Sequence, residues 1–406
     1  MTGQSIISID AMGGDKGPAP VLGGLARAVR KLPELRFLVH GDAAEITRIL
    51  RRRSYAALRE RCEVIGTEDV VAMGDKPSRA IRERRGSSMW ASLEAVKAGR
   101  ARVAVSCGNT GALLAMAVLI LRKAPGIDRP AIAVHWPSAA PHGYNTVLDV
   151  GADLRAGPRA LTQYAVMGAE YARLSFGLAR PRIGFLNIGT EPTKGTVDLH
   201  LAAETVAAVA EREPDMLAAA GFVEGTDISG ADVDVVVTDG FTGNIALKTA
   251  EGTAEFIRTG LREAFEYSIL SRIGALFALT SLRRFRKRID PRRVNGGVFL
   301  GLNGTVVKSH GGADAVGVEA AVKLAAKLAA GDFAAGLERQ LARVDLSALP
   351  HGHGHGHGAG QEPDEGPRIG TIADDRPRNR PPAYPPGTEP AAQTGETAST
   401  TLGRRS

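Results

Sequence analysis

One local pattern recurs along the chain: a short β-branched run leads into a polar turn with glycine and then into an apolar helix. The pattern occurs at residues 5–9, 103–106 and 235–237, each followed by such a turn. Runs of this length are typical of buried parallel strands, and glycine among polar residues marks turns. Strands alternating with helices in this order predict an α/β fold with a mostly parallel sheet.

The polar turns after these strands are the first candidates for a ligand site. In open α/β sheets, ligands bind beyond the carboxyl ends of strands, where glycines admit the backbone and helix N-termini attract anions. The turns after residues 103–106 and 235–237 both combine glycine, asparagine and threonine, so we expect them to line one crevice. The turn residues expected at the ligand are Gly13, Gly14, Gly108, Thr110, Gly111, Gly189, Asp239, Gly240 and Gly243.

The composition narrows the class of protein. Of the 406 residues, 44% are hydrophobic, which is ordinary for a globular protein. The sequence contains no run of about 18 apolar residues, so it predicts no membrane span, and its amino terminus lacks the pattern of a secretion signal. The two cysteines, Cys62 and Cys107, fit a reducing cytoplasm. Cys107 precedes a helix and is a candidate nucleophile, but a small buried apolar role is the favoured interpretation.

The charge of the chain suggests an acidic partner. The formal net charge is +7, and arginines cluster locally. Aromatic residues make up only 5% of the chain, and the sequence has no recognition helix, zinc finger or aromatic RNA-binding signature. We therefore expect phosphate, an acidic protein or an anionic lipid as partner, and no nucleic acid.

Charged residues near two of the turns are candidates for anion binding. Lys76 and Arg79 flank a Pro-Ser helix start, where they form either an anion site or a solvated basic face. Asp10 and Asp15 lie in the first turn, where they either orient a lysine or cap the turn and the helix. Both pairs of alternatives stay open from the sequence.

A hairpin is predicted near the carboxyl end of the ordered chain. Asn303-Gly304 is a typical two-residue hairpin turn, and the second strand leads to Lys308 and His310. A lone histidine is more often structural than catalytic, so both roles remain open for His310.

Residues 251–288 combine an apolar face with basic residues. Two interpretations compete: contact with a second subunit, or contact with an anionic membrane surface. The two coexist if the helix tips protrude from a dimer. We expect a protruding amphipathic helical element at about 251–290, whose contact residues are Leu270, Ile273, Leu276 and Phe277.

The composition changes again at residue 350. A His-Gly repeat at 351–358 is followed by a stretch rich in Pro, Gly, Arg, Asp and Thr without periodicity. Such a segment predicts a disordered tail over 350–406, dispensable for activity, with at most weak binding of transition metals by the His-Gly repeat. Residues 1–349 then form the catalytic domain.

Taken together, the loops resemble the bacterial phosphate acyltransferase PlsX family, the acyl-ACP:phosphate transacylases. The resemblance covers about residues 4–345. Its six motifs, in order, are IDAMGGDKGP at 9–18, GDKPSRAIR at 74–82, SCGNTGALLA at 106–115, LNIGTE at 186–191, DGFTGNIALKT at 239–249 and GLNGTVVKSHG at 301–311. Chance agreement over six ordered motifs is negligible. Two features depart from the family: Cys107, where many relatives have a small residue such as alanine, and the tail, which has no counterpart.

The resemblance implies transfer of a fatty acyl group from acyl carrier protein to inorganic phosphate, giving acyl phosphate for phospholipid synthesis. It also implies a homodimer with a three-layer α/β/α fold, similar to phosphotransacetylases and isocitrate-type dehydrogenases, and no cofactor. The carrier protein is strongly acidic, which suits the arginine-rich surface of this chain. A membrane glycerol-3-phosphate acyltransferase is a candidate further partner.

For this reaction, the candidate residues divide by role. Phosphate already carries the charge it needs for attack, so positioning and oxyanion stabilisation supply most of the rate. The candidate oxyanion donors are Asn109, Lys194, Asn244 and backbone N–H groups of the turns, with Lys248 as an alternative to Asn244. The candidates for capturing phosphate are Lys76, Arg79 and Lys308, and His310 is the candidate proton donor to the leaving thiolate.

Two other functions remain as alternatives. A nicotinamide-dependent decarboxylating dehydrogenase has a related fold, but the G-x-G-x-x-G fingerprint and an obvious acidic metal cluster are missing from the sequence. A non-catalytic scaffold at the membrane surface would use the basic stretch at 266–288, yet it would not need six polar loops.

Overall fold

The computed structural model describes residues 6–289, 296–331 and 333–350. All of them belong to the first of two compact units, Met1–Gly354. The second unit, His355–Ser406, lies outside the described residues. The tail predicted over 350–406 also lies outside them, apart from Pro350.

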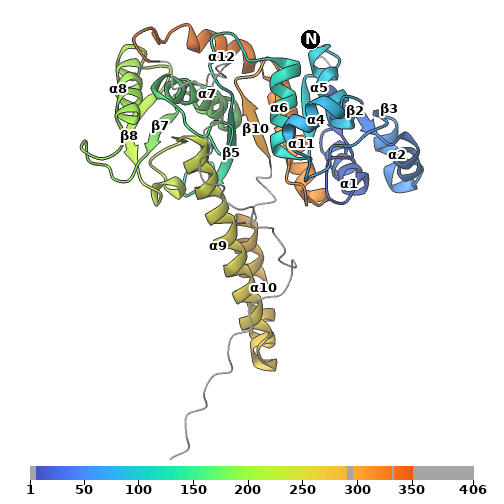
Figure 1. The fold of residues 1–406 in the computed structure, drawn as a ribbon. Helices are drawn as coiled ribbons and strands as arrows, with labels where there is room; N and C mark the ends of the chain where they lie inside the picture. Colours follow the sequence, from blue (N-terminus) through green and yellow to red (C-terminus); the bar gives the residue numbers. More distant parts are fainter. Residues whose placement is uncertain (1–5, 290–295, 332, 351–406) are drawn as a thin grey trace, which may run out of the picture. The chain divides into compact units, whose positions relative to one another are not determined.

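An eleven-stranded sheet runs through the described part of the chain (Figure 1). In chain order its strands are β1 (Ile6–Asp10), β2 (Arg36–Gly41), β3 (Cys62–Gly66), β4 (Val103–Ser106), β5 (Ala131–Pro137), β6 (Tyr144–Leu148), β7 (Arg182–Leu186), β8 (Ala218–Val223), β9 (Val235–Val237), β10 (Gly297–Leu300) and β11 (Thr305–Lys308). Across the sheet they lie in the order β3-β2-β1-β4-β11-β10-β5-β6-β9-β7-β8.

Helices separate most of these strands along the chain. They are α1 (Pro18–Val29), α2 (Ala43–Leu50), α3 (Ala56–Arg59), α4 (Pro77–Glu83), α5 (Ser88–Lys97), α6 (Thr110–Leu121), α7 (Pro158–Phe176), α8 (Val197–Arg212), α9 (Gly240–Glu266), α10 (Ile269–Ile289), α11 (Ala315–Ala330) and α12 (Phe333–Leu341). Two short 3₁₀ turns lie at Arg53–Tyr55 and Asp227–Ser229.

The sheet consists of two parallel sections that run in opposite directions. Strands β3, β2, β1, β4 and β11 are parallel, and so are β6, β9, β7 and β8. Between the two sections, the pairs β11–β10, β10–β5 and β5–β6 are antiparallel. The mostly parallel sheet expected from the sequence is confirmed, but its carboxyl ends lie at two edges.

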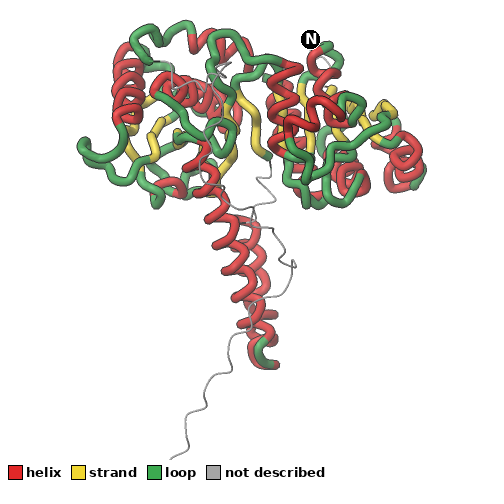
Figure 2. The backbone as a smooth tube through the Cα atoms, in the orientation of Figure 1, coloured by secondary structure: helices red, strands yellow, loops and turns green. Residues whose placement is uncertain are grey.

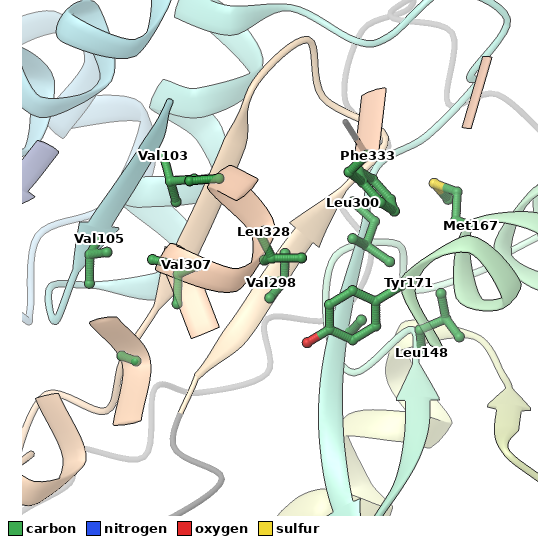
Figure 3. Packing of buried hydrophobic residues seen from close by; sticks show 14 of the residues in the cluster. Val103, Val105, Leu148, Met167, Tyr171, Val298, Leu300, Val307, Leu328 and Phe333 are labelled. Carbon is green, nitrogen blue, oxygen red and sulfur yellow. The ribbon is translucent and has the colours of Figure 1, made fainter. Parts of the chain in front are cut away.

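Strand residues alternate between two buried layers, because successive side chains point to opposite faces of a sheet. Val103 and Val105 join one cluster with Leu328 of α11, as Figure 3 shows. Ala104 between them joins a second cluster with Leu113 of α6. Helices α1, α7 and α11 thus cover one face and α5 and α6 the other, which confirms the three-layer α/β/α architecture.

The predicted hairpin at Asn303-Gly304 is confirmed. Its strands β10 and β11 pair antiparallel, from Gly297 opposite Lys308 to Phe299 opposite Val306. The hairpin fills the centre of the sheet, where β11 extends the first parallel section.

The long helices α9 and α10 lie side by side (Figure 2). Only Gly240 and Gly243 of α9 are buried, so most of this helix faces solvent in the single chain. On α10, Leu270 is 80% exposed and Phe277 is 88% exposed. No helix in the described part of the chain is both long and apolar enough to cross a membrane.

Candidate functional site

The first part of the candidate site lies where three neighbouring parallel strands end. Asp10, Ser106 and Lys308 are the last residues of β1, β4 and β11, and they face one another in one row of the sheet. The turns that follow therefore meet at one edge, which we name the phosphate edge after the anion expected there from the sequence. A backbone hydrogen bond of 3.0 Å from Asp15 N to the Gly311 carbonyl oxygen joins two of these turns.

Asp10 is buried at the phosphate edge and organises the first turn. The hydroxyls of Ser88 and Ser106 each donate to its carboxylate at 2.6 Å, and Met12 N donates at 3.2 Å. Burial raises the pKa of Asp10, while these hydrogen bonds act in the opposite direction. The carboxylate is thus a fixed anchor for the glycine turn above it.

Gly13 and Gly108 allow two of the turns to touch. A Cβ on Gly13 would lie 2.8 Å from the Cα and N atoms of Gly108 and 2.4 Å from an Asp10 carboxylate oxygen. No larger residue fits there, because side-chain atoms do not approach backbone this closely. Gly14 is next to the carbonyl of Gly311, at 3.3 Å from the position of a Cβ. The contact leaves the backbone of both turns open at the edge.

Lys308 places a buried amino group at the phosphate edge. Its Nζ donates to the carbonyl oxygen of Ser309, and 8% of the residue is exposed. Burial lowers the pKa of Lys308, and the charge of Lys248 adds to this effect. The carboxylates of Asp10 and Asp15 act in the opposite direction. An arriving phosphate would bring the negative charge that favours the ammonium form.

Cys107 and His310 border the same edge and differ in exposure. Burial raises the pKa of the Cys107 thiol to about 11, so the thiol stays protonated near neutral pH. This favours the small buried apolar role expected for Cys107. His310 is exposed at the rim, where its Nδ1 accepts a hydrogen bond of 3.2 Å from Gly312 N.

Asn109 positions a neighbouring loop. Its Oδ1 accepts from Ala112 N at 3.0 Å and so caps α6, whose first residues are Thr110 and Gly111. Its Nδ2 donates to the carbonyl oxygens of Met73 at 2.7 Å and Asp75 at 3.0 Å. Both amide hydrogens are therefore used within the protein.

Lys76 and Arg79 lie on the loop and helix that Asn109 holds. Lys76 is the exposed N-cap of α4, next to Pro77, which would lie 3.0 Å from a Cβ on Gly111. Arg79 points to solvent and pairs with Glu83 at 2.6 Å. Glu83 therefore balances the charge of Arg79, whereas in the described part of the chain no carboxylate forms an ion pair with Lys76.

The second part of the site is the turn that begins α9. Asp239 caps the helix by accepting from the N and Oγ1 atoms of Thr242, both at 2.9 Å. Gly240 N donates to the carbonyl oxygen of Asp153 at 2.7 Å. A Cβ on Gly243 would lie 1.9 Å from the carbonyl oxygen of Asp149, so only glycine fits in this turn.

Asp149 supports this turn and was not among the predicted site residues. It is fully buried, and burial raises its pKa to about 6. Asn244 of α9 packs on the same loop, donating from Nδ2 to the carbonyl oxygen of Val150 at 3.2 Å. The Asp149 carboxylate accepts hydrogen bonds, with N···O distances of 2.6–3.0 Å, from the backbone N–H groups of Ile132, Gly151, Ala152 and Asp153.

The two turns follow strands of opposite direction; that they line one crevice, as expected from the sequence, stays a prediction. Strands β4 and β9 run in opposite directions, so Gly108 and Gly243 follow opposite ends of the sheet. The charge of Lys248, in the third turn of α9, acts on Lys308. Lys248 therefore links α9 to the phosphate edge, although it also pairs with Glu251 at 2.7 Å.

The loop with Gly189 and Lys194 follows β7. Asn187 shapes it by donating from Nδ2 to the Lys194 carbonyl oxygen at 3.0 Å, and His200 also bonds this oxygen at 2.7 Å. The Lys194 side chain is exposed. The hydrogen bonds of Lys194 thus stay within its own loop and α8. The role of Lys194 at the reacting atoms therefore stays a prediction.

A groove of about 770 Å³ extends from the N-terminal turns of α6. One wall is a face of α6, and the other walls are the segment before β5 and Ala152, which Asp149 holds in place. The residues lining it are Gly111, Leu114, Ala115, Val118, Lys123, Asp128, Arg129, Pro130 and Ala152.

The carboxylates of the site are used for hydrogen bonding within the protein. Asp10 accepts from two hydroxyls, and Asp149 accepts from backbone N–H groups. Across residues 6–289, 296–331 and 333–350, no group of three or more His, Cys, Asp or Glu side chains is placed to hold a metal ion.

Comparison with known proteins identifies the family. The family model described as "Fatty acid synthesis protein" matches residues 6–335. The phosphate acyltransferase of Ruegeria sp. (strain TM1040) is 57% identical over 84% of this chain and 89% of its own length. That of Dinoroseobacter shibae is 58% identical over 84% of this chain and 86% of its own. The chain belongs to the phosphate acyltransferase family.

Solved structures agree with the fold of this phosphate acyltransferase family member. The EutD phosphotransacetylase from Staphylococcus aureus has a TM-score of 0.52 at 17% identity, covering 81% of this chain and 95% of that one. A phosphotransacetylase from Streptococcus pyogenes has a TM-score of 0.53 at 17% identity, covering 80% and 94%. At this identity, the likeness concerns the fold alone.

Two features of this phosphate acyltransferase family member were not predicted as parts of the site. Asp149 follows β6 in the run Leu-Asp-Val-Gly, and aspartate before glycine at a strand end is a recognisable signal for a side chain that holds a turn. Ser88 and Ser106 give no comparable signal. Their pairing with Asp10 depends on the tertiary fold, since Ser88 is 78 residues away in the chain.

Proposed function

We propose that this protein transfers a fatty acyl group from acyl carrier protein to inorganic phosphate, releasing acyl phosphate and the free carrier thiol. A phosphate oxygen attacks the thioester carbonyl carbon, a C–O bond forms, the C–S bond breaks, and the thiolate takes up a proton. Membership of the phosphate acyltransferase family supports the reaction. The observation that carries it at the site is the buried Lys308 beneath the glycine turns of the phosphate edge.

Phosphate binding is assigned to the phosphate edge. Lys308 supplies a cation, and the first turn of α6 supplies N–H groups that no helical carbonyl accepts. Lys248 and Lys76 add positive charge nearby, and Arg79 is the weaker candidate because Glu83 pairs with it. A dianion in this setting is held without any covalent step.

Oxyanion stabilisation is assigned first to backbone donors of the Gly13-Gly14 and Gly108 turns. Asn109 is a positioning residue, because both its amide hydrogens go to loop carbonyls. Asn244 keeps one amide hydrogen beyond its bond to Val150, but its turn follows the opposite end of the sheet from the phosphate edge, so Asn244 and Lys194 are the weaker candidate donors. His310, exposed at the rim, is the proposed proton donor to the thiolate.

The partners follow from charge and exposure. The net charge of +7 suits an acidic carrier protein, and no nucleic acid is proposed as partner. The exposed apolar residues of α10 are assigned to contact with a second copy in a homodimer or with an anionic membrane. The protein would then act in the cytoplasm, in part at the inner face of the membrane, where a glycerol-3-phosphate acyltransferase consumes the acyl phosphate.

The test is release of carrier thiol from acyl carrier protein, measured with and without phosphate. We expect thiol release to require phosphate and to yield one acyl phosphate per thiol. Lys308→Met should raise the KM for phosphate about 10- to 100-fold, the scale of a charge-assisted hydrogen bond. The control Lys97→Met, at an exposed lysine ending α5, should behave as wild type. Thiol release that ignores phosphate, or reduction of a nicotinamide instead, would refute the proposal.

A further inference from the structure

The groove along α6 has an apolar wall with helical spacing. Gly111, Leu114, Ala115 and Val118 lie three and four residues apart, which places them on one face of the helix. Pro130 and Ala152 line the groove from outside the helix. The groove therefore offers a continuous apolar surface along α6.

The two ends of the groove differ in chemistry. Gly111 belongs to the first turn of α6, next to the Asn109 cap and the phosphate edge. Lys123 and Arg129 line the groove beyond the other end of the helix. An elongated ligand would thus have one terminus near the reacting atoms and the other between two cations.

The positive charge at the far end is only partly balanced. Lys123 donates from Nζ to the backbone carbonyl oxygen of Asp128 at 2.8 Å, which uses one of its three hydrogens. The carboxylate of Asp128 pairs with Arg159 at 2.8 Å. Arg129 is exposed, and within the described residues no carboxylate forms an ion pair with it. This end is therefore a place for an anionic group.

The ligand must then be elongated, largely uncharged and anionic at one end. Acyl carriers hold their acyl chain as a thioester on a phosphopantetheine arm, which has this composition. About 14 bonds separate its phosphorus from the thioester carbon, and at about 1.1–1.2 Å per bond of extended chain the arm spans about 16 Å. Helix α6 from Gly111 to Leu121 rises about 15 Å.

We propose that this groove binds the phosphopantetheine arm of the acyl donor, with the thioester at the Gly111 end and the phosphodiester at Lys123 and Arg129. This assignment rests on the acyl transfer proposed above, and it adds the residues that recognise the acyl donor. A long acyl chain fits the groove less well, because its apolar end would lie against two cations.

The first experiment compares two small donors that differ only in the phosphate. Octanoyl-phosphopantetheine and octanoyl-pantetheine are assayed for thiol release in the presence of saturating inorganic phosphate. The wild type should prefer the phosphorylated donor about tenfold in kcat/KM, the scale expected for two exposed cations. A Lys123→Gln/Arg129→Gln double variant should lose this preference and keep its activity on octanoyl-pantetheine. Arg30→Gln, at the end of α1 on the other face of the sheet, is the matched control.

The second experiment narrows the groove itself. Val118→Phe fills the apolar wall, whereas Leu119→Phe enlarges a neighbouring side chain that is 49% exposed and does not line the groove. Val118→Phe should lower kcat/KM about tenfold or more for acetyl- and octanoyl-phosphopantetheine alike, with the KM for phosphate and the melting temperature unchanged. Leu119→Phe should leave all of these values unchanged.

Each result has a defined meaning. A wild-type enzyme that is active with phosphate but does not prefer the phosphorylated donor overturns the arm assignment and leaves the acyl transfer intact. A loss in Val118→Phe confined to the octanoyl donor assigns the groove to the acyl chain and likewise overturns it. If the wild type releases thiol from neither donor nor from acyl carrier protein, the proposed function itself fails.

Discussion

At the residue scale, the site depends on a carboxylate that takes no part in the proposed chemistry. Asp10 lies at the end of β1 with two serine hydroxyls at 2.6 Å, and the turn above it closes on Gly108. Substitutions in this turn therefore act through backbone geometry. Their effects should be larger on turnover than on stability.

Gly13→Ala tests this directly. The new methyl group would lie 2.4 Å from an Asp10 oxygen and 2.8 Å from the Gly108 backbone, so the turns must separate. We expect a loss of about 100-fold in kcat, the scale of one oxyanion donor, and destabilisation of about 1–3 kcal/mol from overpacking. Gly74→Ala is the control, because a Cβ there meets nothing within 4 Å. Equal kcat values in the two variants would contradict the role of the turn.

His40 predicts how stability depends on pH. It faces Asp10 across β1 and β2, is 2% exposed, and burial lowers its pKa from 6.5 to about 4. Between these values the unfolded chain binds more protons than the folded one, so stability falls as the pH drops below about 6.5, by up to about 3 kcal/mol. Urea unfolding at pH 7.5 and pH 5 measures the difference. Burial also lowers the pKa of His135, to about 3, so His40→Gln should make the profile less steep without flattening it. An equally steep profile would assign the acid sensitivity to His135 and other groups.

Residue roles were predicted less well than residue positions. Asp10, Asn109 and Lys308 were all expected at strand ends, since polar residues after buried runs mark those ends. The use of Asn109 as a clamp was not predicted, because it depends on the carbonyls of Met73 and Asp75, which only the folded chain brings within 3.0 Å.

At the element scale, strands with a clear composition were predicted with their bounds. Val103–Ser106 and Val235–Val237 are β-branched runs between polar turns, and both are strands. Strand β8 was missed, because Ala218–Val223 lies at the sheet edge and is mostly alanine and glycine, which have low strand propensity.

The sequence predicted a mostly parallel sheet, which is confirmed, but the place where the strand direction reverses was not predicted. The segment 138–143 between β5 and β6 is too short for a parallel crossover, which needs about a dozen residues, so the reversal was readable from the sequence. The effect of the Lys248 charge on Lys308 was not, because it depends on where the two side chains lie in the folded chain.

Helix α10 gives a prediction of its own. A variant with serine at Leu270, Ile273, Leu276 and Phe277 removes the exposed apolar face. We expect it to lose binding to vesicles that contain anionic lipid, or dimer formation in light scattering, or both, because each contact requires that face. If the variant is still a dimer, it should still release thiol from a water-soluble donor. Unchanged vesicle binding together with an unchanged mass would refute the assignment of this face.

At the scale of the whole molecule, the described core ends close to residue 350. Leu349 is buried, and the core cluster extends to Val344. A chain that ends at Leu349 should therefore keep its melting temperature and its phosphate-dependent thiol release within about twofold of the full chain. A marked drop in either measurement would assign the His-Gly and Pro-rich tail to the functional unit.

The position of the β10–β11 hairpin has a consequence for synthesis of the chain. Strands β4 and β5 end at Ser106 and Pro137, yet the strands that join them, β10 and β11, span only Gly297–Lys308. During synthesis, the edges of β4 and β5 therefore stay unpaired until the hairpin has been made. Unpaired strand edges are surfaces that aggregate or recruit chaperones. The nascent chain completes its sheet only after about three quarters of its length has been made, so we expect a chain that terminates before Gly297 to keep these strand edges unpaired.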